Sequence, residues 1–466
     1  MAPLRAKRPL LDRARELGRL TGAWRAAART PQFVAVEGRR RVGKTFLLGH
    51  FAAGRRGLFF GATRQSETVE LQRLYQTVQR DMGPQVAALT GGGFQSWSAA
   101  FKFFFAIAAR QPAVVVLDEI PYLTGSTPGF ASVLQHEWDH RPRDARLLLI
   151  TSGSAISTMT ALFGPRGPLR GRPTETLQVE PLSAYEARAF LPGLAPDKFI
   201  EAYAACGGYA LHLEKWDTRR STDANLLALA GSAGGLLLDD AQSMLQEELA
   251  ATSTHALVMS EIGRGRSTFS EISSALQGKK IAYSLSLLER AGFIRKAIPL
   301  AAPKGARGHY EIDDAYLNFW FRVLSSDATL VEAGQGAAVL ARRREEWEKH
   351  VRWVFEEAAR DHARRLVASG ELPKDMLLGR WWRHDRGLDV EIDVLGIQGH
   401  KTSLIGGVRW SAKPLPLGAL TEMERMAAHA PSPGQNITYA LWTRSGVDRA
   451  LTDRGARSFT VADMLR

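Results

Sequence analysis

A glycine-rich octapeptide between two apolar runs restricts this chain more than any other feature. Residues 38–45 read Gly-Arg-Arg-Arg-Val-Gly-Lys-Thr, a complete GxxxxGK[ST] pattern, after the run 33–36 and before the run 46–48. Backbone N–H groups of such a loop turn inward around phosphates, and the following helix adds the positive end of its dipole. We therefore expect a strand, a phosphate-binding loop and a helix within an α/β fold. The expected phosphate-binding residues are Gly38, Arg39, Arg40, Arg41, Val42, Gly43, Lys44 and Thr45.

A second motif supplies the acids that such a loop needs. The apolar run 114–117 is typical of a strand buried on both faces of a parallel sheet, and it ends in Asp118 and Glu119. We expect Lys44 to neutralise phosphate charge, and Thr45 and Asp118 to hold Mg²⁺. Glu119 is then placed to polarise the attacking water. ATP and Mg²⁺ are the predicted cofactors; the alternative is a surface acid pair after a core strand.

Length and composition set the frame for these motifs. A chain of 466 residues predicts two to four domains. A net charge of +13 favours a polyanionic partner, most often nucleic acid, unless an arginine-rich genome alone explains it. The single cysteine, Cys206, excludes an internal disulfide and indicates a reducing, cytoplasmic setting. No secretory signal is expected at the N-terminus, and no apolar stretch approaches the ~20 residues that cross a bilayer, so no membrane partner is predicted.

Strands and helices are expected to alternate over the first 182 residues. A helix is predicted over 10–30, with Leu10, Leu17 and Leu20 on its apolar side. This alternation indicates a doubly wound parallel sheet, and an extra strand between the phosphate loop and the acid strand indicates the additional-strand branch of P-loop ATPases rather than the kinase-like branch. Further strands are predicted over 58–62, 113–118, 147–151 and 176–179, and further helices over 67–81 and 97–110.

After residue 182 the sequence pattern changes from alternating strands and helices to mainly helices. Residues 183–250 are predicted to form a helical lid. Helices over 255–263, 269–276 and 279–291, followed by β-like runs over 293–298 and 309–312, predict a winged helix-turn-helix in residues 251–325. Residues 326–466 are predicted to form a further α/β domain, with strands within 376–410. The expected domains are therefore 1–182, 183–250, 251–325 and 326–466.

Together these motifs resemble the prokaryotic DEXX-box P-loop ATPases of the archaeal-ATPase group, in the AAA+ superfamily. That group carries a C-terminal DUF234-like domain related to PD-(D/E)XK nucleases. The resemblance covers nearly the whole chain, although the proline that follows the lid motif in the family is Ala210 here. The matching segments are Asp12-Arg13, Glu16-Leu17, 38–45, 117–119, 152–154, 168–172, 181–183, 207–209, 318–322, 379–382 and 391–393.

The resemblance implies two further residues for the nucleotide site. Ser154 matches the end of the sensor strand and would contact the γ-phosphate or the water, although a serine there is also an ordinary turn former. Arg172 lies where AAA+ proteins supply an arginine to a neighbouring subunit, which would require a homo-oligomer. Arg170 competes for that role, and either arginine is also explained as a surface cation.

The predicted recognition helix indicates a contact with double-stranded DNA. Ile281, Leu285 and Leu288 recur at helical spacing and are expected to face the core. A winged helix can also bind a protein instead of DNA. The expected DNA-binding residues are Lys279, Lys280, Tyr283 and Ser284, facing outward near the helix start, with Lys304 and Arg307 in the wing.

The C-terminal domain departs from the nuclease pattern of the family. Asp393 supplies the first acid, while Glu391 and Glu356 are further acids nearby in the pattern. Gly407 stands where the second acid belongs, and Arg409 stands where the lysine belongs. Because glycine has no ligand and arginine cannot act as a base, we expect a nuclease-like fold with little or no cleavage. Nucleic acid is still expected to fit the cleft through Arg380, Arg383 and Arg409, with Trp381 and Trp382 either stacking on bases or divided between core and surface.

Three functions follow as hypotheses. The first is an ATPase that couples its nucleotide state to DNA. The second is a STAND-like signalling switch with a protein partner at the winged helix. The third is an active nuclease whose missing acid comes from Glu356 or Glu391.

Overall fold

The computed structural model describes residues 10–154, 156–249, 253–277, 281–303, 306, 308–385 and 388–466. The chain divides into two compact units, each described separately below. The first unit contains residues 1–181 with 244–250, and the second contains residues 182–243 with 251–466. The finer division of the second unit into lid, winged helix and C-terminal domain stays a prediction. None of the helices within the described residues is long and apolar enough to cross a membrane.

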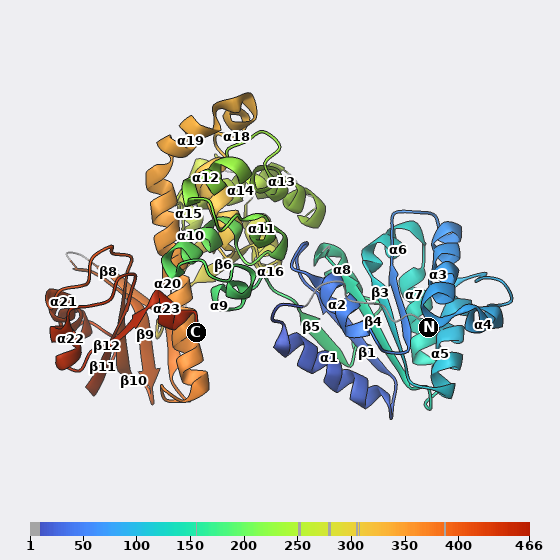
Figure 1. Ribbon diagram of the computed structural model, residues 1–466. Coiled ribbons are helices and arrows are strands. Elements are labelled where there is room, and N and C mark those ends of the chain that lie inside the picture. The colour runs from blue at the N-terminus through green and yellow to red at the C-terminus, as the bar shows by residue number, and fades with distance from the viewer. Residues whose placement is uncertain are drawn as a thin grey trace. The chain divides into compact units, whose positions relative to one another are not determined.

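The first unit is built on a five-stranded parallel sheet in the order β2-β3-β4-β1-β5 (Figure 1). The strand β4 lies between β1 and β3, so the expected additional strand is present and the P-loop NTPase fold is confirmed. The central strands β3 and β4 are buried along their whole length, as their unbroken apolar runs predict. The strands are β1 Gln32–Glu37, β2 Gly57–Gly61, β3 Ala113–Asp118, β4 Leu147–Gly153 and β5 Glu175–Gln178.

Helices cover both faces of this sheet (Figure 1). One face carries a dense aromatic core in which the rings of Phe33 and Trp138 meet edge to face at 5.2 Å. The helix expected over 10–30 begins only at Ala14, because Asp12 and Arg13 have positive φ angles, and Leu10 lies before it. The helices are α1 Ala14–Ala27, α2 Lys44–Ala52, α3 Glu67–Met82, α4 Pro84–Ala87, α5 Trp97–Arg110, α6 Ile120–Ser126, α7 Phe130–Asp139 and α8 Ile156–Phe163.

The second unit begins with short helices and continues into three helices and a two-stranded ribbon. The strands β6 Ile294–Ala297 and β7 His309–Ile312 pair antiparallel, in the element order expected of a winged helix. The predicted third helix of that group begins at Ala282 rather than at residue 279, and residues 279 and 280 lie outside the described part. The helices are α9 Ala184–Ala187, α10 Pro196–Cys206, α11 Ala210–Lys215, α12 Thr222–Leu229, α13 Leu236–Leu249 (its residues 244–249 are assigned to the first unit), α14 Ser253–Gly263, α15 Phe269–Ala275 and α16 Ala282–Arg290.

The unit ends in a five-stranded mixed sheet in the order β12-β11-β10-β9-β8. The long helix α20, Arg344–Ser369, contacts β8, β9 and β10, while α21, Gly418–Ala427, contributes to the core beside β10 and β11. Strands were expected only within 376–410, so β11 and β12 add to the prediction. The strands are β8 Leu377–Asp385, β9 Leu388–Gln398, β10 Lys401–Arg409, β11 Pro433–Thr443 and β12 Arg457–Thr460; the other helical segments are α17 Ala315–Phe319, η3 Trp320–Leu324, α18 Ala328–Leu330, η4 Val331–Gln335, α19 Gly336–Arg342, α22 Arg449–Asp453 and α23 Val461–Met464.

Candidate functional site

The glycine-rich loop joins the carboxyl end of β1 to the first turn of α2. A Cβ atom on Gly38 would lie 2.1 Å from the carbonyl oxygen of Val179, so only glycine fits this position. Gly43 caps α2 with a φ of 94°, a left-handed conformation that glycine adopts without strain. The N-cap residue gives α2 no side-chain cap, and the positive end of the α2 dipole lies at this loop.

Lys44, Thr45 and Asp118 converge behind this loop. The Lys44 ammonium donates to the carbonyl oxygens of Gly38 at 2.7 Å and Arg39 at 2.9 Å. The Thr45 hydroxyl donates to Asp118 Oδ2 at 2.7 Å. Asp118 is the last residue of β3 and is only 3% exposed, so its carboxylate is aimed across the sheet edge toward α2. The loop and the acid strand therefore meet at the place that the two sequence motifs require.

Glu119 follows at the N-terminus of α6 in a left-handed backbone conformation, with a φ of 57°. Its Oε2 atom accepts hydrogen bonds from the Ser154 hydroxyl at 2.9 Å and from the Ser154 N–H at 3.2 Å. A non-glycine residue in this region of the backbone is uncommon and costs about 1–3 kcal/mol. The turn after β3 and the end of β4 thus hold this carboxylate at the carboxyl edge of the sheet.

Two contacts at this edge involve residues to which the sequence had assigned no role in the site. Ser152 donates from its hydroxyl to Asp118 Oδ1, so Asp118 is held from both α2 and β4. The register pairs Leu117 with Thr151, and this pairing is the signal that would have placed Ser152 beside Asp118. The buried Arg13 donates to the carbonyl oxygen of Val42 inside the loop at 2.9 Å.

Arg172 lies in the connection before β5 and pairs with a carboxylate of its own unit. Its Nη2 atom lies 3.0 Å from Asp139 Oδ2, and its Nη1 atom donates to the Arg170 carbonyl oxygen at 2.9 Å. The hydrogen bond that Arg172 donates to Asp139 holds the pKa of the Asp139 carboxyl below its usual range. The competing Arg170 donates to the Pro165 carbonyl oxygen at 2.9 Å.

The predicted DNA-binding residues divide into three groups. Tyr283 is 67% exposed near the start of α16. Ser284 is not outward, as we expected, but 2% exposed, because its hydroxyl bonds to His255 Nδ1 of α14 at 3.0 Å. The remaining four, Lys279, Lys280, Lys304 and Arg307, lie outside the described residues.

In the C-terminal sheet, arginine side chains form ion pairs with the acids of the predicted degenerate nuclease site. Asp393 Oδ2 accepts from the Val408 N–H at 2.8 Å and from Arg409 Nη1 at 3.0 Å. Arg380 places Nη2 at 2.7 Å from Glu391. Burial, with Asp393 nearby, raises the pKa of Glu356 to about 7. In the part of the chain that is described, no group of three potential ligands is arranged to hold a metal ion.

Gly407 and the paired tryptophans complete this region. A Cβ atom on Gly407 would lie 3.3 Å from Leu441 and 3.4 Å from Met423, so this position faces the apolar core beside α21. Trp381 belongs to that core, whereas Trp382 is half-buried with its ring 5.3 Å from that of His309. Of the two possibilities for the pair, the division between core and surface is the one observed.

An ionic network joins the β6–β7 ribbon to the C-terminal sheet and α20. Arg380 lies 2.8 Å from Glu311 of β7 as well as 2.7 Å from Glu391 of β9. Arg295 of β6 lies 2.9 Å from Glu311 and also pairs with Glu357 of α20. The Leu300 N–H donates to the Arg380 carbonyl oxygen at 2.8 Å. The ribbon is therefore fixed to the domain that follows it.

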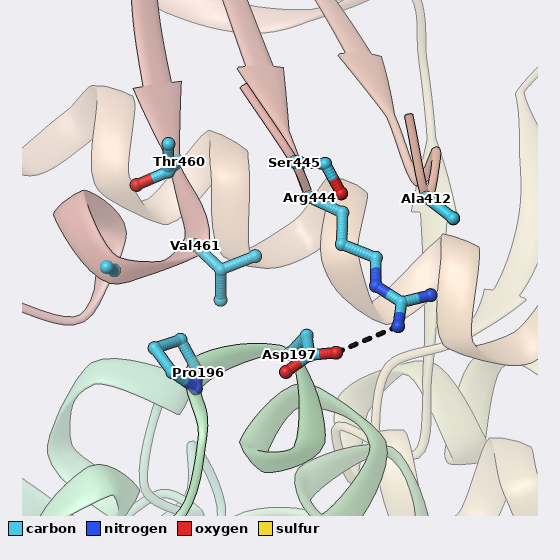
Figure 2. Close-up of a pocket in the computed structure, with 8 residues that line it drawn as sticks. Pro196, Asp197, Ala412, Arg444, Ser445, Thr460 and Val461 are labelled. Atoms are coloured by element: carbon cyan, nitrogen blue, oxygen red, sulfur yellow. Dashed lines mark hydrogen bonds and ion pairs between the residues drawn. The ribbon is translucent and has the colours of Figure 1, made fainter. Parts of the chain in front are cut away.

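A separate pocket of about 300 Å³ lies between α10 and the ends of β11 and β12 (Figure 2). Arg444 pairs with Asp197 within it at 2.8 Å, while Thr460 and Val461 form another part of its wall. None of its lining residues belongs to the sites predicted from the sequence.

Comparisons with known proteins give the following similarities. Residues 10–216 match the family described as an ATPase domain predominantly from Archaea, and residues 320–425 match DUF234, a family of archaeal and bacterial proteins of unknown function. An uncharacterized protein of Methanocaldococcus jannaschii is 25% identical over 391 residues, which are 81% of this chain and 83% of that protein.

Two solved structures are also similar. The Walker-type ATPase of Pyrococcus abyssi is 17% identical, with a TM-score of 0.49 over 67% of this chain and 96% of that one. The ORC2 protein of Aeropyrum pernix, solved as ADPNP–ADP complexes, is 13% identical, with a TM-score of 0.43 over 72% of this chain and 98% of that one.

The two family matches fit the geometry. The first spans the sheet, the glycine-rich loop and the acid strand, and the second spans α20 and the start of the mixed sheet. The chain therefore combines a P-loop NTPase fold, which matches the archaeal ATPase domain family over residues 10–216, with a match to DUF234 over residues 320–425.

Proposed function

We propose that this chain binds ATP with Mg²⁺ at the carboxyl edge of β1, β3 and β4, hydrolyses it, and couples its nucleotide state to double-stranded DNA. The observation that carries the hydrolytic part is the 2.7 Å contact between the Thr45 hydroxyl and Asp118, with Glu119 next in the chain. Both oxygens suit a hard cation, so Thr45 and Asp118 would hold Mg²⁺, which when bound neutralises charge on the β- and γ-phosphates.

The side chains around this edge have distinct roles in the proposal. Lys44 exchanges the carbonyl oxygens of Gly38 and Arg39 for phosphate oxygens when nucleotide enters the loop. Glu119 orients the attacking water and accepts its proton. Since Ser154 now donates two hydrogen bonds to Glu119, it sets the position of that carboxylate before turnover.

Arg172 is proposed to act on the nucleotide of a neighbouring copy in a homo-oligomer. Its pair with Asp139 is partly exposed, with side chains 26% and 40% accessible, so solvent weakens it and a phosphate can replace the carboxylate. Mixing Arg172→Ala with Glu119→Gln tests this idea, because mixed oligomers contain some sites with both residues intact. ATP hydrolysis above the sum of the two separate variants is expected. Strictly additive rates would rule out an arginine supplied in trans.

The coupling to DNA is proposed to run through α16 and the ribbon that follows it. The first experiment measures steady-state ATP hydrolysis with Mg²⁺, with and without a mixed-sequence duplex, using Glu119→Gln as the blank. A rate that duplex raises several-fold, and that added salt suppresses, supports a DNA-coupled ATPase. A low rate that is indifferent to duplex argues against the coupling.

A signalling switch with a protein partner is the second candidate, and the surface chemistry of the described α14–β7 region favours it. Three large apolar side chains are exposed there, with Phe269 49%, Tyr283 67% and Ile298 51% accessible. Such residues suit a protein interface better than a phosphate backbone. Tyr283→Ala should leave duplex affinity unchanged if this candidate holds, and should lower it if α16 enters the major groove.

We propose that the DUF234 domain does not cleave nucleic acid. Arg409 and Arg380 already neutralise Asp393 and Glu391, and Gly407 offers no ligand. Incubation of supercoiled plasmid with the chain and Mg²⁺ is expected to give no nicked product. Nicking that disappears in Asp393→Ala would instead establish a nuclease with a relocated acid, such as Glu356.

A further inference from the structure

The loops that precede the strands of the first unit bring their arginines together at the edge opposite the nucleotide site. The registers place Gly57 beside Val114, Ala113 beside Leu147, and Gln32 beside Leu148, so β1 to β4 start side by side. The N–H groups of Val114 and Ala113 donate at 3.0 Å to the carbonyl oxygens of Arg56 and Arg146, respectively. We call residues 28–31, 53–56, 110–112 and 140–146 the amino edge.

The amino edge is strongly basic. It contains one carboxylate, Asp144, against seven arginines. Residues 1–181 share this excess, because they hold 25 of the 61 lysines and arginines but 13 of the 48 acids. Residues 182–466 are nearly balanced, with 36 cations and 35 acids. The arginines of the amino edge are Arg29, Arg55, Arg56, Arg110, Arg141, Arg143 and Arg146.

Part of this arginine set is explained by helix ends. The helices α2, α5 and α7 end at this edge, and their last carbonyl groups carry the negative end of the helix dipole. Arg146 donates to the carbonyl oxygens of Ala109 and Arg110 at 3.1 and 2.7 Å. Arg56 reaches the same helix end, while Arg55 and Arg141 cap α2 and α7. Because the acceptors are backbone carbonyl groups and not carboxylates, these contacts do not neutralise the positive charge of the four arginines.

The other three arginines have no such role. Arg29, Arg110 and Arg143 are exposed, and among the described residues their side chains form no hydrogen bond or ion pair. By contrast, Arg73 pairs with Glu70, and Arg172, in the connection before β5, pairs with Asp139 at the end of α7. Across the described residues, no arginine of the amino edge has an acid within ion-pair distance; Asp139 acts on Arg141 only over a longer distance, so most of the repulsion between these like charges remains. Such a surface is complementary to a polyanion.

The chemistry of the loops selects among polyanions. Their 18 residues contain no phenylalanine, tyrosine or tryptophan to stack on the bases of a single strand. They also carry no exposed large apolar side chain to enter a lipid surface. Four strands spaced by about 4.8 Å give a row of roughly 15 Å, over which a duplex presents on the order of nine phosphate charges. A duplex backbone therefore fits best.

We propose that the amino edge binds the phosphate backbone of double-stranded DNA without reading its sequence. This surface shares no residue with α16 or with the nucleotide site, so the proposal neither requires nor excludes the function proposed above. It would hold duplex against the ATPase domain itself. Contact at this edge is expected to add salt dependence but no base preference.

The test compares two full-length variants of equal charge change. Arg110→Glu/Arg143→Glu reverses two arginines of the amino edge that cap no helix. Arg15→Glu/Arg166→Glu reverses two exposed arginines elsewhere in the unit. Affinity for a fluorescent 30-base-pair duplex of mixed sequence is measured by anisotropy over a range of KCl concentrations. The edge variant is expected to bind at least about tenfold more weakly, with a salt slope shallower by about 2, since each lost contact removes about 0.9.

Controls separate this surface from the other functions of the chain. Both variants should keep the circular dichroism spectrum and the ATP hydrolysis rate that the unchanged chain shows without DNA. Equal affinity and slope in the two variants would overturn the proposal. Tighter binding to duplex RNA, or to phosphatidylserine vesicles, than to duplex DNA would also overturn it. Loss of ATP hydrolysis in Glu119→Gln with unchanged duplex binding would leave the amino-edge proposal standing.

Discussion

Glu119 is the side chain on which turnover is expected to depend most. Its replacement by glutamine keeps the shape and the hydrogen bonds from Ser154 but removes the base, so nucleotide affinity should stay within a few-fold. Hydrolysis should fall by about 10²–10⁴-fold, the usual contribution of a general base. Single-turnover hydrolysis and fluorescent-nucleotide titration check both parts. Ser154→Ala is the companion variant, with a smaller loss; a Glu119→Gln rate equal to wild type would assign the water to another group.

Glu356 makes stability depend on pH in a defined window. Its folded-state pKa of about 7 lies above the ordinary value of 4.5, so the folded state binds the extra proton, and stability falls as pH rises from about 4.5 to 7. Glu356→Gln removes this dependence and should stabilise the chain at pH 8 by roughly 1–3 kcal/mol, with little effect at pH 5. Urea denaturation at both pH values measures it.

Two buried histidines make stability depend on pH in the opposite direction to Glu356. For this reason the stability of Glu356→Gln is compared with that of the unchanged chain at each pH. Burial lowers the pKa of His350 to about 3 and that of His362 to about 4, so both add stability as pH rises from those values to their ordinary pKa of 6.5, where the gain levels off. These contributions cancel in the difference between variant and wild type. An equal stabilisation by Glu356→Gln at pH 5 and pH 8 would contradict the raised pKa.

The residues of the nucleotide site were predictable where a motif fixes both identity and spacing. Thr45 and Asp118 belong to two such motifs, and their contact follows from the parallel sheet. Ser284 was predicted wrongly although the same periodicity contained the answer. At 100° per residue, Ser284 lies next to the apolar face formed by Ile281, Leu285 and Leu288. It is therefore at the edge of the buried surface, where its hydroxyl forms a hydrogen bond with His255. The role of Arg13 depends on a contact 29 residues away, which no local pattern contains.

Among the elements, the β6–β7 ribbon should depend on its attachment to α20 and the C-terminal sheet. Arg295 lies between Glu311, Asp313 and Glu357, so Arg295→Ala leaves these carboxylates without their shared cation. We expect a loss of about 1–3 kcal/mol in the free energy of unfolding. Arg290→Ala, at an exposed position on α16, is the matched control and should stay within about 0.5 kcal/mol. Equal denaturation midpoints for the two variants would show that the network contributes little.

Element prediction succeeded where hydrophobic burial dominates. The strands β3 and β4 are buried throughout, so their apolar runs were sufficient. The strand β11 was missed because only its last four residues, 440–443, are buried, and the preceding part has the polarity of a loop. The four residues of β12 are all partly exposed and carry no periodic signal. Both pair with a neighbouring strand through long-range contacts that the sequence alone does not reveal.

At the scale of the whole molecule, two compact units should unfold in separable steps. Calorimetry is expected to resolve two transitions, and only the transition of the first unit should respond to nucleotide. At 100 times its Kd, a nucleotide stabilises its unit by about 2.7 kcal/mol, or roughly 5–10 °C. Lys44→Ala should abolish this shift while leaving the second transition in place. A single transition that nucleotide moves as a whole would mean that the two units unfold cooperatively.

Cys206 has a practical consequence for measuring distances within this protein. It is the chain's only cysteine, it ends α10 fully buried, and burial raises the pKa of its thiol well above the usual range. Maleimide dyes react with accessible thiolates, so they should not label Cys206 in the folded protein. Two engineered surface cysteines, one in each unit, can therefore carry a donor and an acceptor without any removal of a native thiol. The natural sequence is thus a ready background for single-molecule distance measurements during an ATP cycle.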